Sequence, residues 1–298
     1  MNYVITGGAG NISAPLIRSL LAAGKRVTVI GRNADNLKEL TQAGATAAIG
    51  SVEDVVFLTK TFKEADAIYT MIPPKWDADQ WKKYIGSIGE NFAAAIKGSK
   101  VKHVVNLSSV GAHMPDGCGP VSGLYLAERA LNTLQGVNIL HLRPAYFYQN
   151  LLSNIGLIKH AGIMGGNFSI GNNQFPIVDP SDIAAVAFEE LISLKFTGHS
   201  VRYIASDEIS TDAIAQTIGS AIGKPDLKWV QFPDDQAQQG MLQAGLSKEV
   251  AVNYTEMGNA LHTGKMTEDY WKNRPAAFGK VKLGDFARVF AAIYAASK

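Results

Sequence analysis

Cysteine is almost absent from this chain of 298 residues, in which Cys118 is the only one. A single cysteine excludes an internal disulfide framework and suits a reducing compartment. Cys118 lies in a glycine-rich segment, 115–120, that we expect to be a loop. A lone loop cysteine is more often incidental than catalytic, so we assign it no role.

Long apolar runs are also missing. No stretch of about 18 consecutive apolar residues occurs, so no membrane-spanning helix is expected. Glycines interrupt the first apolar segment and no charged leader precedes it, so we expect no signal peptide. The default prediction is a soluble cytoplasmic protein.

Charge of either sign is scarce, at 18% of the residues, and the formal net charge is +2. No cluster of Lys and Arg resembles a basic arm, so direct binding to nucleic acid is not expected. The six histidines are scattered without the spacing of metal ligands, so no metal site is predicted. With 47% hydrophobic residues the chain can form one large domain, or a large and a small one.

The most informative stretch is the N-terminal one, TGGAGNIS at 6–13, with the segments on either side of it. An apolar run at 3–5 precedes it, apolar residues at helical spacing follow as far as Leu21, and a second apolar run occupies 27–30. The order strand, glycine turn, helix, strand is typical of a dinucleotide-binding βαβ unit.

The glycines of this turn have a physical reason. A side chain at Gly7 or Gly10 would hold a pyrophosphate away from the N–H groups that begin the helix, where the helix dipole favours anions. The spacing is G-x-x-G-x-x-S, so Ser13 stands where a third glycine is usual. The alternative is a tight βα turn in a protein that binds no nucleotide.

The end of the second predicted strand indicates which dinucleotide binds. NAD-binding units usually place Asp or Glu there to bind the ribose hydroxyls, whereas here Gly31, Arg32 and Asn33 precede the first carboxylate, Asp35. A guanidinium can pair with a 2′-phosphate that a carboxylate would repel. Arg32 therefore favours NADP(H), and the alternative is an ordinary surface arginine at a strand end.

Strands and helices alternate along the first half of the chain, which predicts parallel strands buried on both faces. The fold class predicted is α/β: a Rossmann-type, doubly wound parallel sheet with a smaller α/β C-terminal substrate domain. The predicted strands are 3–5, 27–30, 45–49, 67–72, 103–107 and 137–142, and the helices between them are 12–21, 35–43, 53–62, 77–97 and 124–134.

Ligands of such sheets bind beyond the carboxyl ends of the strands, which gathers several loops into one place. The cofactor-binding residues predicted there are Thr6, Gly7, Gly10, Asn11, Ile12, Arg32, Asn33, Ser51, Val52, Ile72, Pro73 and Ser108.

Beyond residue 150 the pattern is less regular. Residues 162–173 contain four glycines and are expected to form a loop region. We predict a dinucleotide-binding domain at 1–150, with the helix at 179–198 packing back on it, and a smaller substrate-covering domain built from 151–178 and 199–298. The predicted elements of the smaller domain are strands at 201–205 and 229–232 and helices at 211–222, 234–244, 248–257 and 283–296.

Five motifs, in order and spacing, resemble the NmrA-like group of atypical short-chain dehydrogenases/reductases. They are TGGAGNIS, Arg32, Ile72-Pro73-Pro74, NLSSVGAH and LRPAYFYQNLL, and the resemblance covers residues 1–195. It implies a Rossmann domain with an NADP(H) site. Members of this group include NADPH-dependent quinone reductases, phenylpropanoid reductases and redox-sensing regulators without catalysis.

Ordinary short-chain reductases use a Tyr as the acid and a Lys four residues later, which lowers the pKa of the Tyr. Here Tyr125 is followed by Arg129, and a planar guanidinium does not replace a compact ammonium. We therefore interpret the Tyr–Lys dyad as absent. Tyr125 and His113 remain candidate catalytic residues, with packing and loop exposure as their respective alternatives.

A quinone reductase can work without that dyad, since hydride transfer chiefly needs the nicotinamide held against a flat apolar substrate. Candidates to line the substrate pocket are Tyr146, Phe147 and Tyr148, with aromatic core packing as the alternative. Three functions stay open: an NADPH-dependent reductase of a small molecule, a non-catalytic NADP(H) sensor, and a sugar-nucleotide epimerase, which the missing lysine disfavours. A homodimer or a protein partner is likewise left open.

Overall fold

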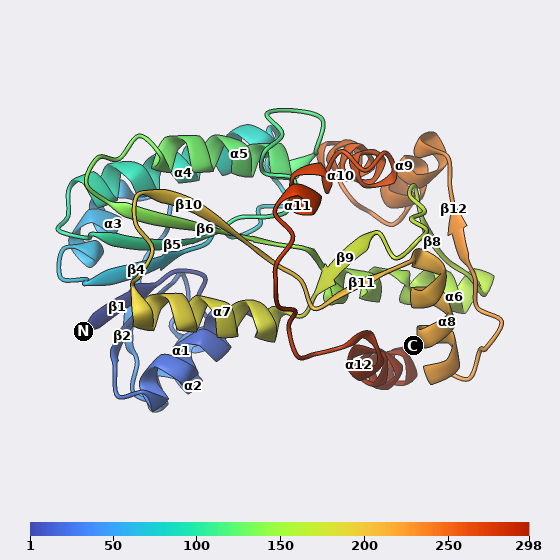
Figure 1. Ribbon diagram of the computed structural model, residues 1–298, viewed down its shortest axis with the longest axis horizontal. Helices are drawn as coiled ribbons and strands as arrows, with labels where there is room; N and C mark the ends of the chain where they lie inside the picture. Colours follow the sequence, from blue (N-terminus) through green and yellow to red (C-terminus); the bar gives the residue numbers. More distant parts are fainter. Residues whose placement is uncertain (298) are drawn as a thin grey trace.

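The computed structural model describes residues 1–297, and a parallel sheet of seven strands runs through its first part (Figure 1). The strands lie in the order β10-β6-β5-β4-β1-β2-β3, and each neighbouring pair is parallel. Chain order reverses between β1 and β4, which is where sheets of this kind bind ligands. The bounds are β1 Asn2–Ile5, β2 Arg26–Gly31, β3 Thr46–Ile49, β4 Ala67–Thr70, β5 His103–Leu107, β6 Asn138–Pro144 and β10 His199–Ile204.

Helices cover both faces of this sheet (Figure 1). On one face lie α1 (Ser13–Ala22), α2 (Lys38–Gln42) and α7 (Pro180–Ser193), and on the other α3 (Val55–Phe62), α4 (Trp81–Lys97) and α5 (Pro120–Leu131). The alternation of side chains along β1 explains why both faces need cover. Tyr3 and Ile5 pack with α1 and α7, whereas Val4 packs with α3 and α4, and none of the three is exposed.

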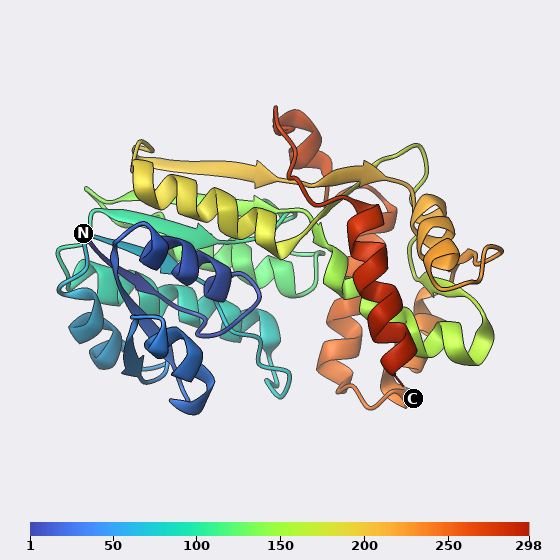
Figure 2. The same cartoon turned by 90° about the horizontal axis from the view of Figure 1, so that it is seen from below.

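The second part of the molecule is built around two small sheets. β7 (Tyr146–Phe147), β9 (Phe175–Val178) and β11 (Asp207–Ile209) form one, and β8 (Met164–Gly166) pairs with β12 (Trp229–Gln231) in the other. The strands β10 and β11 follow each other from the large sheet into this second part (Figure 2). Around the small sheets lie the 3₁₀ helix Tyr148–Asn154 and the helices α6 (Ile155–Ala161), α8 (Thr211–Ala221), α9 (Asp234–Gln243), α10 (Lys248–His262), α11 (Glu268–Lys272) and α12 (Leu283–Ala296).

The fold class is as predicted, but several elements differ. Residues 199–204, assigned above to the smaller domain, form the edge strand β10 of the large sheet. Residues 162–173, expected to be a loop, contain β8. The helix expected at 124–134 begins earlier, at Pro120, because proline is well suited to a first helical turn. The elements of 146–161 and α11 were not predicted.

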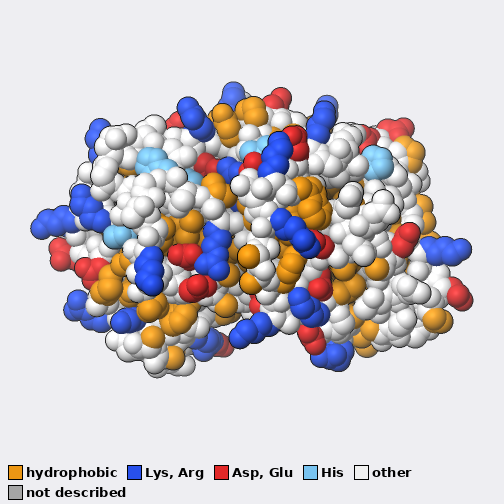
Figure 3. All heavy atoms as spheres, in the orientation of Figure 1, with side chains coloured by type: hydrophobic (Ala, Val, Ile, Leu, Met, Phe, Trp, Pro, Cys, Tyr) orange, Lys and Arg blue, Asp and Glu red, His pale blue; other side chains and the backbone are white. Residues whose placement is uncertain are grey.

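Two kinds of feature are absent from residues 1–297. No helix there is long and apolar enough to cross a membrane, and no group of three or more His, Cys, Asp or Glu side chains is placed to hold a metal ion. On the face drawn in Figure 3, basic and acidic side chains are interspersed. Cys118 is buried, and its burial raises the pKa of the thiol to about 12.

Candidate functional site

The glycine turn between β1 and α1 needs its glycines for the fold itself. Gly7 has φ +88°, a conformation that side chains rarely adopt, and a Cβ there would lie 2.6 Å from Cγ of Met71. The N–H of Gly8 donates to the carbonyl of Ile30 at 3.0 Å and ties the turn to β2. The backbone of the turn is thus fixed from two sides.

The hydroxyl groups of Ser13 and Thr6 hold the same turn in place through hydrogen bonds. Ser13 Oγ donates to the carbonyl of Thr6 at 2.9 Å and is buried, which explains a serine where a third glycine is usual. Thr6 Oγ1 accepts from the N–H of Met71 at 2.7 Å and donates to its carbonyl at 3.2 Å. The side chain of Thr6 therefore joins the ends of β1 and β4 and is not free to bind a ligand.

The beginning of α1 offers N–H groups without acceptors. The N–H groups of Asn11, Ile12 and Ser13 donate to no acceptor within residues 1–297, and no side chain caps the helix. No acidic residue lies in the first turn. Free N–H groups and the positive end of the dipole together form a ready site for a phosphate.

Arg32 and Asn33 follow β2 at the same edge of the sheet. The side chain of Arg32 is exposed and forms no ion pair with any residue that the structure describes. The nearest carboxylate in sequence, Asp35, pairs with Lys38 at 2.8 Å. Asn33 Oδ1 accepts the N–H of Asp35 at 2.8 Å, so Asn33 shapes the turn. The guanidinium of Arg32 is thus a cation available for an anionic ligand.

The loop after β3 lies next to the end of β2, because the two strands are paired as far as Gly31 and Ile49. Ser51 Oγ accepts the N–H of Glu53 at 3.1 Å, and Glu53 in turn accepts from the hydroxyl of Tyr84 at 3.2 Å. Burial, with help from Glu53, raises the pKa of Tyr84 to about 12, and the charge of Arg32 opposes this shift. Of the remaining predicted cofactor residues, Val52 is buried and Ile72 and Pro73 are half-buried.

Ser108, at the end of β5, belongs to a buried polar network that the sequence did not reveal. Its hydroxyl donates to Oε1 of Glu128 at 2.5 Å. Arg143 binds the same carboxylate with two hydrogen bonds, Nε to Oε1 at 3.0 Å and Nη2 to Oε2 at 2.6 Å. Burial alone would lower the pKa of Arg143, but the bound carboxylate outweighs burial and raises it. The signal available in the sequence was a glutamate on the apolar face of α5.

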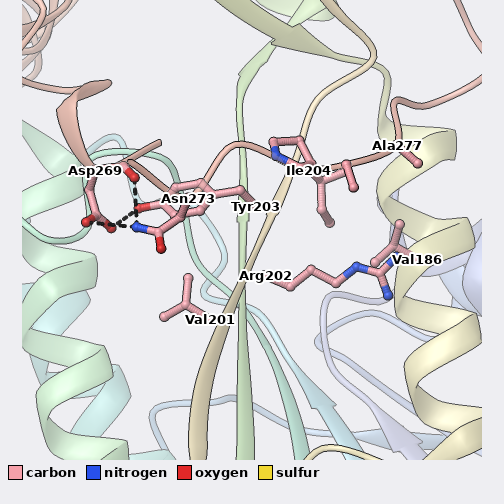
Figure 4. Close-up of a pocket in the computed structure, with 10 residues that line it drawn as sticks. Val186, Val201, Arg202, Tyr203, Ile204, Asp269, Asn273 and Ala277 are labelled. Carbon is pink, nitrogen blue, oxygen red and sulfur yellow. Dashed lines mark hydrogen bonds between the residues drawn. The ribbon is translucent and has the colours of Figure 1, made fainter. Parts of the chain in front are cut away.

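The network continues into the C-terminal part of the chain. Nη1 of Arg143 donates to the hydroxyl of Tyr203 at 3.0 Å and to Oδ2 of Asp269 at 3.1 Å, and Tyr203 also donates to Asp269. Asp269 lies on α11, so these bonds hold α11 against the carboxyl edge of the large sheet. Tyr203 and Asp269 also line a cavity of about 580 Å³ beside β10 (Figure 4).

The two candidate catalytic residues lie near this network. Tyr125 is half-buried on α5, whereas Arg129 is exposed, so the helix turns Glu128 rather than Arg129 towards the protein interior. His113 is half-buried, and its Nδ1 has no hydrogen-bond partner within the described residues. Burial lowers the pKa of His113, although the charge of Asp269 opposes the shift.

The three predicted substrate residues separate into two groups. Tyr146 and Phe147 are half-buried, and the Tyr146 ring lies 5.1 Å from that of Phe175. Tyr148 is fully buried, stacks on Phe286 with the ring centres 5.2 Å apart, and donates to Asp207 at 2.6 Å. Tyr148 is therefore a core residue in this structure, and we retain only the other two as candidate lining.

Comparison with known proteins adds a family and a fold. A model of the NmrA-like family matches residues 2–270. An NAD(P)H azoreductase from Xenophilus azovorans is 25% identical over 256 residues, which are 85% of each chain. A nucleoside-diphosphate-sugar epimerase from Staphylococcus aureus has a TM-score of 0.76 at 15% identity and covers 97% of this chain and 100% of its own. A quinone oxidoreductase from Escherichia coli, solved with NADPH, has a TM-score of 0.74 at 16% identity and covers 96% of this chain and 98% of its own. At these identities the two structures show that the fold is shared.

Proposed function

Because the chain belongs to the NmrA-like family, we propose that it is an NADPH-dependent reductase that transfers hydride to a quinone or a related carbonyl or enone compound. The observation that carries the proposal is the start of α1, where three N–H groups without acceptors follow the glycine turn. The residues present fit a dinucleotide, since a pyrophosphate accepts from such groups without displacing any protein contact.

The choice of NADP(H) rests on Arg32. Its exposed guanidinium has no partner within residues 1–297 and follows β2, where a 2′-phosphate would lie. In this proposal the N–H groups of Asn11, Ile12 and Ser13 bind the pyrophosphate, and Gly7 and Gly10 shape the turn that leads to them. Asn33, Ser51, Val52, Ile72 and Pro73 surround the adenosine half, and Ser108 lies towards the nicotinamide half.

When bound, the cofactor supplies the hydride. The chain itself must hold the acceptor flat against the cofactor and exclude water, which are matters of position rather than of acid strength. Tyr146 and Phe147 fit this role as aromatic side chains at the carboxyl edge of the sheet. Tyr125 and His113 are candidate proton donors, and the smaller C-terminal part would cover the acceptor. Two similar proteins, an azoreductase and a quinone oxidoreductase, support an acceptor of the aromatic or quinone type.

The test is a steady-state assay of NADPH oxidation with a panel of quinones, next to a direct measurement of NADPH binding. We expect turnover well above the rate without protein. Tight NADPH binding with no turnover on any acceptor would contradict the enzyme and favour the second candidate, a non-catalytic NADP(H)-sensing protein. The observation that favours this alternative is the exposed Arg129, which leaves Tyr125 without a neighbouring cation on its own helix.

A further inference from the structure

An exposed tryptophan lies in the loop that follows β4. Trp76 is 52% exposed, although tryptophan is usually among the better buried residues. Its ring centre lies 5.2 Å from that of Trp81, at the start of α4, and 6.0 Å from that of Tyr254, on α10. Trp81 and Tyr254 meet edge to face at 5.6 Å. The three aromatic rings thus pack against one another, and the Trp76 side chain is partly exposed to solvent.

The loop that carries Trp76 leaves the sheet next to the glycine turn. Its first residue, Met71, is hydrogen-bonded to Thr6, and its side chain occupies the space next to Gly7. The next residue, Ile72, packs against the group that includes Trp81 and Tyr254. Ile72, one of the residues predicted to contact the cofactor, therefore packs directly with the aromatic group.

Tyr254 adds a free polar group to this surface. Tyr254 is half-buried, and its hydroxyl forms no hydrogen bond with any residue in 1–297, so the hydroxyl can donate to a ligand. Burial raises the pKa of Tyr254 to about 12, so the group is a protonated donor at neutral pH.

We propose that Trp76 and Tyr254 form the part of the substrate site that selects flat aromatic acceptors. The ring of Trp76 stacks on the acceptor, and the hydroxyl of Tyr254 donates to an oxygen of the acceptor. This assignment rests on the proposed reductase function and deepens it, because it gives the site a preference for quinones over aliphatic enones. Neither residue belongs to the set predicted from the sequence.

The test measures acceptor binding separately from turnover. The probe is 1,4-naphthoquinone, added to the full chain saturated with NADP⁺, with binding followed by the quenching of tryptophan fluorescence. We expect Trp76→Ala to weaken binding about tenfold, and Trp76→Phe to retain most of it, since stacking is a property of any aromatic ring. Tyr254→Phe should weaken binding about threefold to tenfold, as expected for one lost hydrogen bond. Trp271→Ala is the matched control, because Trp271 is also partly exposed, at 36%, but lies on α11.

A second measurement compares kcat/KM for 1,4-naphthoquinone and for methyl vinyl ketone, with the Kd for NADPH as the check on folding. Trp76→Ala should lower the first kcat/KM about tenfold and leave the second and the Kd within about twofold. Equal losses on both acceptors, or losses equal to those of Trp271→Ala, would overturn the assignment. Absence of naphthoquinone binding to the wild-type chain would also overturn it. Absence of turnover despite such binding would overturn only the reductase function.

Discussion

Replacing Arg143 by Met should destabilise the protein more than any surface substitution. The side chains of Arg143 and Glu128 are 10% and 6% exposed, and two hydrogen bonds join them. Removing the guanidinium leaves the Glu128 carboxylate buried with Ser108 as its remaining donor. Breaking a buried pair from one side costs about 3–5 kcal/mol. Since about 2–4 °C of Tm corresponds to each kcal/mol in a chain of this order of size, Tm should fall by about 6 °C or more.

The assay is urea denaturation followed by circular dichroism, with Arg288→Met as the control. Arg288 pairs with Asp285 at a similar distance, 2.6 Å, but the two side chains are 76% and 46% exposed. Such a pair contributes less than about 1 kcal/mol. The double variant Arg143→Met/Glu128→Gln should recover part of the loss, because no unpaired charge stays buried. Equal effects of Arg143→Met and Arg288→Met, or no recovery in the double variant, would refute the reasoning.

Three further outcomes follow from the same contacts. Arg32→Ala should weaken NADPH binding about tenfold or more and NADH binding little, by fluorescence titration, because it removes a charge-assisted contact to the 2′-phosphate; equal losses would refute the assignment. Gly7→Ala should lower the free energy of unfolding by about 1–2 kcal/mol or more. Gly24→Ala is the control and should cost less, because both glycines have positive φ but only at Gly7 would a Cβ meet other atoms. Burial lowers the pKa of His141 to about 4. As the pH falls, His141 therefore binds a proton in the unfolded chain before it does so in the folded protein. The free energy of unfolding should fall between about pH 6.5 and pH 4, by up to about 3 kcal/mol. His141→Gln should remove that part of the slope in urea titrations at several pH values, and the exposed His160→Gln should not.

The glycine turn after β1 was the part most open to prediction. Glycine, helical spacing and the position of Arg32 are local features, and the structure has the turn, α1 and β2 where this pattern predicts them. Gly7 nevertheless has a second reason to be glycine that the sequence did not suggest: a Cβ at this position would clash with the side chain of Met71. That contact joins loops that are far apart in the chain, so no local pattern carries it.

Pairings between distant segments could not be predicted for the same reason. A strand was predicted at 201–205, close to the observed β10 (His199–Ile204), but its place beside β6 depends on the crossover through the second part of the molecule. Glu128 and Arg143 look like ordinary charged residues until the fold buries them together. Tyr148 resembles Tyr146 and Phe147 in sequence, yet its position in the core is set by Phe286 and Asp207, far along the chain.

The central claim, hydride transfer from NADPH, is tested most directly by a single turnover without oxygen. The protein is mixed with one equivalent of NADPH and excess 1,4-naphthoquinone, and the loss of NADPH absorbance is followed over time. We predict oxidation of the whole equivalent at a rate far above that without protein, and a slower rate when the transferred hydrogen of NADPH is deuterium. NADPH that is bound but oxidised no faster than in the absence of protein would contradict the account.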